Sequence, residues 1–157
     1  MANPSFGIYS AGMPRLKIGM PATFAFSTEL DVRITDVNYG NHLGNDALLS
    51  LLHEARVRWL RSMSMNEGNV DGLLLIMADA AVCYRAESFA GDNLRIDMAA
   101  TDATGVSCDI VYQVVRTSDN TLIAQAKTGV VFLDPQTRKV SRLPETMRTL
   151  AKAQDQQ

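Results

Sequence analysis

The segment from Asn45 to Met63 carries the sequence feature that most constrains the fold. On a helical wheel, its apolar side chains form a stripe about half the circumference wide, which is more than a helix on a surface needs. The stripe contains Leu48, Leu49, Leu51, Leu52, Ala55, Trp59, Leu60 and Met63. Arg56 falls inside this arc, so its guanidinium must reach water or meet a buried partner. The pattern predicts one long helix that other elements nearly surround.

Alternating apolar and polar residues predict strands on both sides of that helix. One half-buried strand is expected at residues 24–34, and four more at 73–87, 94–101, 106–114 and 122–133. Short turns rich in Gly, Asp and Asn at 90–93, 102–105 and 118–120 are typical of antiparallel neighbours. In the strand at 73–87, one face should hold Leu74, Ile76, Ala78, Ala80, Val82 and Tyr84. The economical packing is an α+β domain, with one antiparallel five-stranded sheet wrapped around the helix.

The 157 residues suffice for one domain with a sizeable core. The density of Pro and Gly in residues 1–22 predicts an irregular N-terminal arm. The domain proper is expected at residues 23–143. Pro144 fits the first position of a short C-terminal helix, so residues 144–157 should form that helix and a polar tail.

Composition excludes several classes of function. The net charge is −2 and there is no run of Lys or Arg, which argues against nucleic acid as a partner. The chain has neither a long apolar run nor the pattern of a signal peptide, so we expect a cytoplasmic protein that does not cross a membrane. Cys83 and Cys108 lack metal-ligand spacing, and the only histidines are His42 and His53. We therefore expect free thiols, no metal and no cofactor.

The chemistry is concentrated between Asp36 and Asp46, in the run DVNYGNHLGND just before the helix. The first turn of a helix offers unpaired N–H groups and a partial positive charge, which suit a polarised carbonyl or an oxyanion. Asp36 could act as base or nucleophile, and His42 could orient a water or protonate a departing thiolate. The same residue types also suit an ordinary strand-to-helix turn with Asn45 or Asp46 as N-cap.

This run resembles the signature of the hot-dog thioesterases of the 4-hydroxybenzoyl-CoA thioesterase type. In that family an Asp-bearing strand end leads into Gly-His, two Asn residues and the central helix, and Asn45 matches the second Asn. Further matching stretches are Glu54-Ala55-Arg56, Tyr84-Arg85-Ala86 and Gly91-Asp92. The resemblance covers residues 24–133. It implies a hot-dog fold and an acyl-CoA thioesterase that works as a homodimer or homotetramer, with sites between subunits.

The resemblance breaks at one important position. Where many members carry the catalytic carboxylate, this chain has Asn38, and Asp36 stands two residues upstream. A second register pairs Asp36-Val37-Asn38 with the Asp-x-Asn of the plant acyl-carrier-protein thioesterases. An amide cannot act as a base, so we expect Asp36 to be the catalytic carboxylate, with Asn38 and His42 holding the water and the developing charge. The expected carbonyl-binding and substrate-binding residues are Gly40, Asn41, Gly44, Asn45, Glu54 and Arg85.

Two members of that set have competing interpretations. Glu54 lies about 13 Å along the helix axis from Asn45 and four residues before Arg58, a spacing typical of an exposed ion pair. Arg85 would suit the phosphates of CoA, or it could be a solvated residue at a strand end.

The small side chains of Ala78, Ala80 and Ala81 would allow a second subunit to approach closely.

Two rival functions remain open from the sequence. Hot-dog hydratases and dehydratases carry a motif that resembles Asp-x-Asn-x-x-His, which Asp36, Asn38 and His42 follow with one extra residue. A hot-dog domain could also bind acyl-CoA without turning it over. The acyl group and the choice between CoA and acyl carrier protein depend on pocket walls that the sequence pattern does not define.

Overall fold

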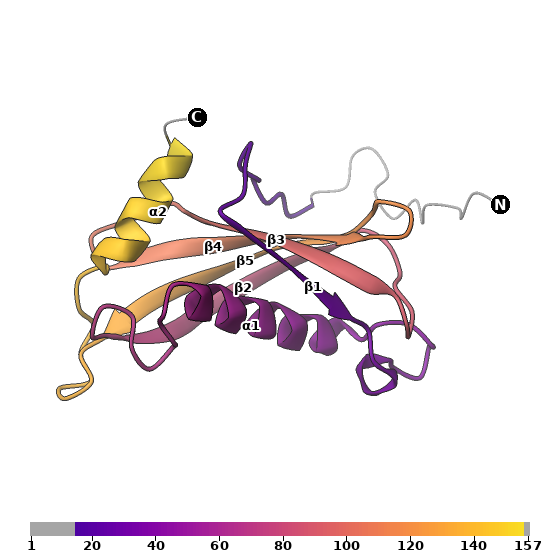
Figure 1. The fold of residues 1–157 in the computed structure, drawn as a ribbon, viewed down its shortest axis with the longest axis horizontal. Coiled ribbons are helices and arrows are strands. Elements are labelled where there is room, and N and C mark those ends of the chain that lie inside the picture. Colours follow the sequence, from indigo (N-terminus) through magenta and orange to yellow (C-terminus); the bar gives the residue numbers. More distant parts are fainter. Residues whose placement is uncertain (1–14, 156–157) are drawn as a thin grey trace.

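Five strands form one antiparallel sheet in the order β1–β3–β4–β5–β2 in the computed structural model, which describes residues 15–155. The elements in chain order are β1 (Phe26–Asp31), the 3-10 turn η1 (Ile34–Asp36), α1 (Asn45–Ser62), β2 (Leu74–Tyr84), β3 (Asn93–Thr101), β4 (Ser107–Arg116), β5 (Thr121–Leu133) and α2 (Glu145–Asp155). The helix α1 runs along one side of the sheet (Figure 1). The predicted α+β arrangement is confirmed.

The wide apolar stripe of α1 is buried against the sheet, as the wheel predicts. Its buried residues are Leu48, Leu51, Leu52, Ala55, Arg56, Trp59 and Leu60. The ring of Trp59 stacks on Phe26 of β1, with centroids 6.3 Å apart. The prediction that Asn45 or Asp46 caps the helix is wrong. The N-cap is Gly44, and no side chain caps the helix there, because Asn45 and Asp46 already lie in its first turn.

Arg56 meets a buried partner inside the apolar arc. Its side chain is 7% exposed and its guanidinium lies 2.7 Å from Oε1 of Glu67, whose Oε2 accepts a hydrogen bond from His53 at 2.9 Å. Burial alone would raise the pKa of Glu67, but the hydrogen bonds from His53 and Arg56 lower it below its usual range. The positive charge of Arg56 therefore lies in the core, where burying it costs little only while Glu67 is present as its partner.

The first strand is shorter than its alternating pattern predicts. β1 ends at Asp31, and the chain then tightens into η1, where Ile34 is 78% exposed. Val32 is still buried, but it comes after the strand has ended. The predicted strand at 24–34 is therefore too long at both ends; Val32 still bonds to Gly91 and Asp92, and the hydrogen bonds of the turn begin at Arg33.

A β-bulge divides β2 into two halves. Its pairing with β5 shifts register between Met77 and Asp79, which leaves Ala78 as the extra residue. Leu75 is consequently buried while Ile76 is 37% exposed, so the prediction of a single apolar face from 74 to 84 is wrong for the first half. Asp79 accepts a hydrogen bond from the N–H of Gly129 at 3.1 Å. A Cβ at residue 129 would lie 2.6 Å from that carboxylate, so a larger residue there would displace the Asp79 side chain.

The two ends of the described chain cover different parts of the sheet. Residues 15–25 form neither helix nor strand; Cys83 of β2 donates to the carbonyl of Leu16, and the N–H of Ala25 donates to Met98 of β3. Residues 1–14 of the predicted arm lie outside the described residues. At the other end, α2 contacts β3 and β4, and Asp71 accepts a hydrogen bond from the N–H of Thr146 in its first turn.

Both cysteines are free and buried. Burial raises the pKa of the Cys108 thiol to about 12, so it stays protonated at neutral pH and is a poor nucleophile. No helix within residues 15–155 has the length and apolarity needed to cross a membrane.

Candidate active site

The run singled out in the sequence forms a closed loop directly before α1. Val37 pairs with Leu43, and the N–H of Asn38 donates to the carbonyl of His42 at 3.0 Å. Inside the loop, Asn38 Oδ1 accepts from the N–H of Gly40 at 2.9 Å, and Asn41 takes a positive φ of 62°. The loop lies near one end of α1, at the end of the sheet away from α2 (Figure 1). It is thus fixed in shape by its own hydrogen bonds.

Asp36 is 5% exposed and bound to Arg33. Its Oδ1 accepts from the Arg33 guanidinium at 2.9 Å, and its Oδ2 accepts from the Arg33 backbone N–H at 2.8 Å and from Nε at 3.1 Å. The hydrogen bonds from Arg33 lower the pKa of the Asp36 carboxyl below its usual range. The role of Asp36 as base or nucleophile stays a prediction, and it requires Arg33 to release at least one oxygen.

His42 lies in the loop with a solvent-accessible side chain that is 32% exposed. Its Nδ1 lies 3.2 Å from the carbonyl oxygen of Leu43. A carbonyl only accepts, so the neutral ring carries its proton on Nδ1 and leaves Nε2 as an acceptor. A Cβ at Gly40 would lie 3.1 Å from His42 Nε2 and 3.2 Å from Asn38 Oδ1. Glycine at position 40 thus gives the imidazole and the amide space to face each other.

Most backbone N–H groups of the loop are already bound within the protein. Those of Gly40 and Asn41 donate to Asn38, that of Gly44 donates to the carbonyl of Asp36, and that of Leu43 donates to Ser88. They are therefore not free to bind a substrate carbonyl in this structure. The first turn of α1, from Asn45 onward, has N–H groups without intrahelical partners and the positive end of the helix dipole.

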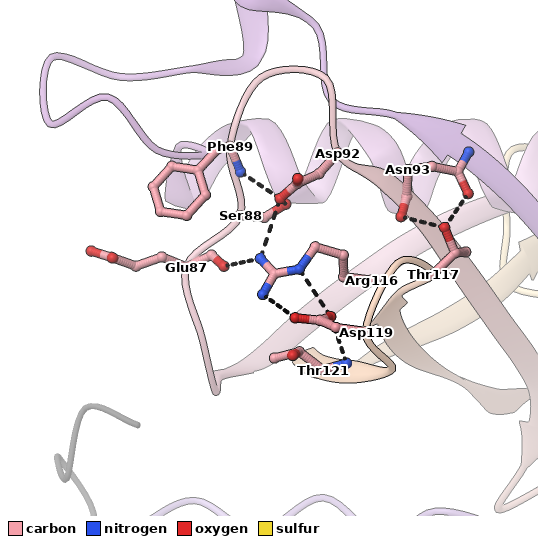
Figure 2. A network of polar contacts seen from close by, with 9 residues as sticks. All are labelled: Glu87, Ser88, Phe89, Asp92, Asn93, Arg116, Thr117, Asp119 and Thr121. Carbon is pink, nitrogen blue, oxygen red and sulfur yellow. Dashed lines mark hydrogen bonds and ion pairs between the residues drawn. The ribbon is translucent and has the colours of Figure 1, made fainter. Parts of the chain in front are cut away.

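The loop between β2 and β3 lies against this segment and is held by Arg116 (Figure 2). The guanidinium donates to the carbonyl of Glu87 at 3.1 Å and to Asp92 Oδ2 at 3.3 Å, while two further bonds join it to Asp119. The same Asp92 oxygen accepts from Ser88 Oγ and from the N–H of Phe89, both at 2.9 Å. Hydrogen bonds from Arg116 also lower the pKa of Asp119.

That loop brings Glu87 to the site, which sequence reasoning missed. Glu87 Oε1 lies 4.0 Å from His42 Nε2. No spacing or motif marks this residue, although it falls inside the Tyr84 to Asp92 stretch that resembles the family. The pairing of Arg33 with Asp36 was also missed. An i, i+3 spacing beside a turn is the signal that could have indicated it.

Two of the predicted substrate-binding residues, Glu54 and Arg85, have side chains that bind other residues of the protein. Glu54 Oε1 accepts from Arg58 Nε at 2.8 Å, so its interpretation as an exposed ion pair is confirmed. Arg85 donates to Gln125 on β5 at 3.0 Å. Asn45 contributes its carbonyl, which accepts from the Tyr84 hydroxyl at 2.8 Å. Burial, and secondarily the charge of Asp46, raises the pKa of Tyr84 and keeps that hydroxyl protonated.

Among residues 15–155, no three His, Cys, Asp or Glu side chains are arranged to hold a metal ion. The chemistry available at the loop is therefore that of an imidazole, an amide, carboxylates and a helix N-terminus.

Comparisons with known proteins point to one family. The model of the thioesterase-like superfamily matches residues 32–150. A 1,4-dihydroxy-2-naphthoyl-CoA hydrolase from Synechocystis is 26% identical over 129 residues, which cover 79% of this chain and 92% of the relative. A protein of the same name from Rippkaea orientalis is 25% identical over 120 residues, which cover 74% and 87%.

Solved structures agree with the sequence relatives. A 1,4-dihydroxy-2-naphthoyl-CoA thioesterase from Synechocystis has a TM-score of 0.72 at 25% identity and covers 83% of this chain and 97% of its own. A Staphylococcus aureus protein solved in complex with CoA shares the fold, with a TM-score of 0.69 at 16% identity over 85% of both chains. The hot-dog fold expected from the sequence is confirmed. The chain belongs to the thioesterase-like superfamily.

Proposed function

We propose that this protein hydrolyses an acyl-CoA thioester to a free acid and CoA. The observation that carries the proposal is His42, which presents an acceptor nitrogen at the N-terminus of the buried helix α1. The two curated relatives support it, since both are named as CoA thioester hydrolases.

The chain's own groups suffice for the chemistry. His42 Nε2 takes a proton from water as the water oxygen attacks the thioester carbonyl carbon. The first turn of α1 stabilises the negative charge that develops on the carbonyl oxygen, and Asn38 lies beside the imidazole to orient the water. When the C–S bond breaks, the protonated His42 returns its proton to the departing thiolate. Asp36, bound to Arg33, either holds the turn or, once released, serves as the base.

An aromatic acyl-CoA is the first substrate to test, because both curated relatives are named for a naphthoyl thioester. The purified protein is incubated with aromatic, short, medium and long acyl-CoAs, and release of free thiol is followed. Hydrolysis of at least one of them is the expected result. If no thioester in the panel is cleaved, the proposed function is wrong, and hydration of an enoyl-CoA becomes the next reaction to measure.

Asp36→Ala and Arg33→Ala separate the two roles of the carboxylate. A fall of at least about 100-fold in kcat for Asp36→Ala, with Arg33→Ala active, identifies Asp36 as a catalytic group. Equal and smaller losses in both variants identify a pair that only holds the turn. Thermal melting of each variant shows that the fold is retained.

We also propose that the protein self-associates through the free edge of β2. Within the described part of the chain this strand pairs only with β5, and it carries the exposed Ile76 and Met77 beside the small Ala78 and Ala80. A second copy meeting this edge would extend the sheet, giving a homodimer or, with a further contact, a homotetramer. The free, buried Cys83 and Cys108 suit a reducing compartment such as the cytoplasm.

Ile76→Lys is expected to shift the protein to monomer in size-exclusion chromatography with light scattering. A charge on this edge repels its own copy across a two-fold axis. Val106→Lys is the matched control, because Val106 is also an exposed apolar side chain but precedes β4, which β5 separates from β2. An unchanged oligomer in Ile76→Lys, or a monomeric wild type, would rule out this edge as the interface.

A further inference from the structure

Glu87 stands next to His42 without being bound by another side chain that the structure describes. Its carboxylate points away from the Arg116 network, which holds only its backbone carbonyl (Figure 2). Oε1 lies 4.0 Å from His42 Nε2, and the two side chains are 40% and 32% exposed. Both atoms are acceptors, because His42 carries its ring proton on Nδ1.

Two acceptors at this separation match the two hydrogens of one water molecule. For a water whose oxygen lies at about 2.8 Å from each atom, the Nε2–O–Oε1 angle would be roughly 90°, close to the H–O–H angle of water. Its lone pairs would then point away from both side chains and be free to attack a carbonyl carbon. A direct hydrogen bond between the two groups, by contrast, would require a shorter distance and a protonated imidazole.

The surrounding structure fixes the backbone of Glu87 beside His42. Ser88 is 1% exposed, and its carbonyl accepts from the N–H of Leu43 at 2.7 Å, which joins the residues next to Glu87 and His42. Arg116 holds the carbonyl of Glu87 itself, and Asp92 holds Ser88 and Phe89. The backbone is thus tied down on both sides of Glu87 while its carboxylate stays accessible.

We propose that Glu87 is a catalytic residue that binds the hydrolytic water together with His42. The inference rests on the proposed thioesterase function and adds a carboxylate beside His42. The water donates one hydrogen to His42 Nε2 and one to Glu87, and its oxygen forms the new bond to the thioester carbon. The proton passes to Nε2, the C–S bond breaks with its electron pair on sulfur, and the imidazolium proton neutralises the thiolate. The negative charge of Glu87 stabilises the imidazolium that exists between these two proton transfers.

The test is Glu87→Ala, assayed with the acyl-CoA that the wild type cleaves best. We expect kcat to fall by about 10- to 100-fold with KM changed less than about threefold, because the lost group holds water rather than substrate. Sodium formate is then added to the variant, with equal sodium chloride as control. Formate can enter the exposed gap and supply a carboxylate, so it should restore part of the rate in Glu87→Ala and leave the wild type unchanged. Glu145→Gln is the matched control, since this exposed glutamate lies on α2, at the other end of the sheet (Figure 1).

Each outcome decides the proposal. Loss of rate with rescue by formate supports it. A rate in Glu87→Ala within twofold of the wild type overturns it and leaves the thioesterase function standing. A loss without rescue overturns it too when Glu87→Gln, which keeps the shape of the side chain, has the wild-type rate, and supports it when Glu87→Gln loses rate as Glu87→Ala does. A wild type that cleaves no thioester overturns both this proposal and the proposed function.

Discussion

His42→Ala is expected to lower kcat for thioester cleavage by about 10²- to 10⁴-fold, the range for loss of a general base and acid. In the proposed mechanism the imidazole both removes the proton from water and returns it to the thiolate, so its loss would affect both steps. Nδ1 is held by the carbonyl of Leu43, and the side chain is partly exposed. The melting temperature should therefore change little, and the effect should lie in kcat rather than in KM.

The second histidine provides the control for that experiment. His53 lies on the exposed face of α1 and binds Glu67, well along the helix from the loop. His53→Ala should keep the wild-type kcat, because its imidazole does not meet the loop at residues 36–44. A variant His42→Ala that retains more than about a tenth of the wild-type kcat would show that another group is the base. Asp36 would then be the next residue to replace.

Glu67→Ala is expected to lower the free energy of unfolding by about 3 kcal/mol, because it leaves the buried Arg56 guanidinium unpaired. For a chain of this size, that loss corresponds to a fall of roughly 6–12 °C in Tm. The control is Glu54→Ala, which removes an exposed pair with Arg58 and should cost less than about 0.5 kcal/mol. Denaturant unfolding followed by circular dichroism measures both.

A second substitution tests the cause of that loss. Adding Arg56→Met to Glu67→Ala removes the stranded charge, so most of the lost stability should return. If the double variant is no more stable than Glu67→Ala, packing rather than charge explains the cost.

Acidification should reduce the difference in the free energy of unfolding between the wild type and Glu67→Ala. The folded protein lowers the pKa of Glu67 from its usual value of 4.5, so the carboxylate stabilises the fold above that pH. This contribution disappears as the pH falls through the lowered pKa of the folded state. A constant difference down to the lowest pH at which the protein stays folded would contradict the linkage.

The sequence was sufficient to predict the helices and strands whose apolar residues repeat with the period of the element. The stripe of α1 and the alternation in β3 both repeat at the period of their secondary structure, so each could be predicted close to its observed bounds. The bulge at Ala78 could not be predicted in this way, because the strand around it is apolar on both faces except at Asp79. A run without polar alternation contains no information on the position at which its register shifts.

The residues of the candidate site also differ in whether the sequence could predict them. The loop before α1 could be identified because its Asn, Asp, Gly and His residues are adjacent in the chain. Glu87 could not, because only the fold and the bonds of Arg116 and Ser88 bring it to His42. The state of Asp36 also depends on geometry, since a carboxylate in a sequence does not show whether Arg33 already binds it.

The strand order has a consequence for how the chain folds during synthesis. Among residues 15–155, β1 pairs with β3 alone and β2 with β5 alone, so the two strands in the first half of the chain do not pair with each other. α1 emerges between these two strands with its apolar stripe uncovered until the second half arrives. The N-terminal half on a translating ribosome should therefore expose apolar surface that is prone to aggregation. Cooperative folding should begin only once β5 has left the exit tunnel.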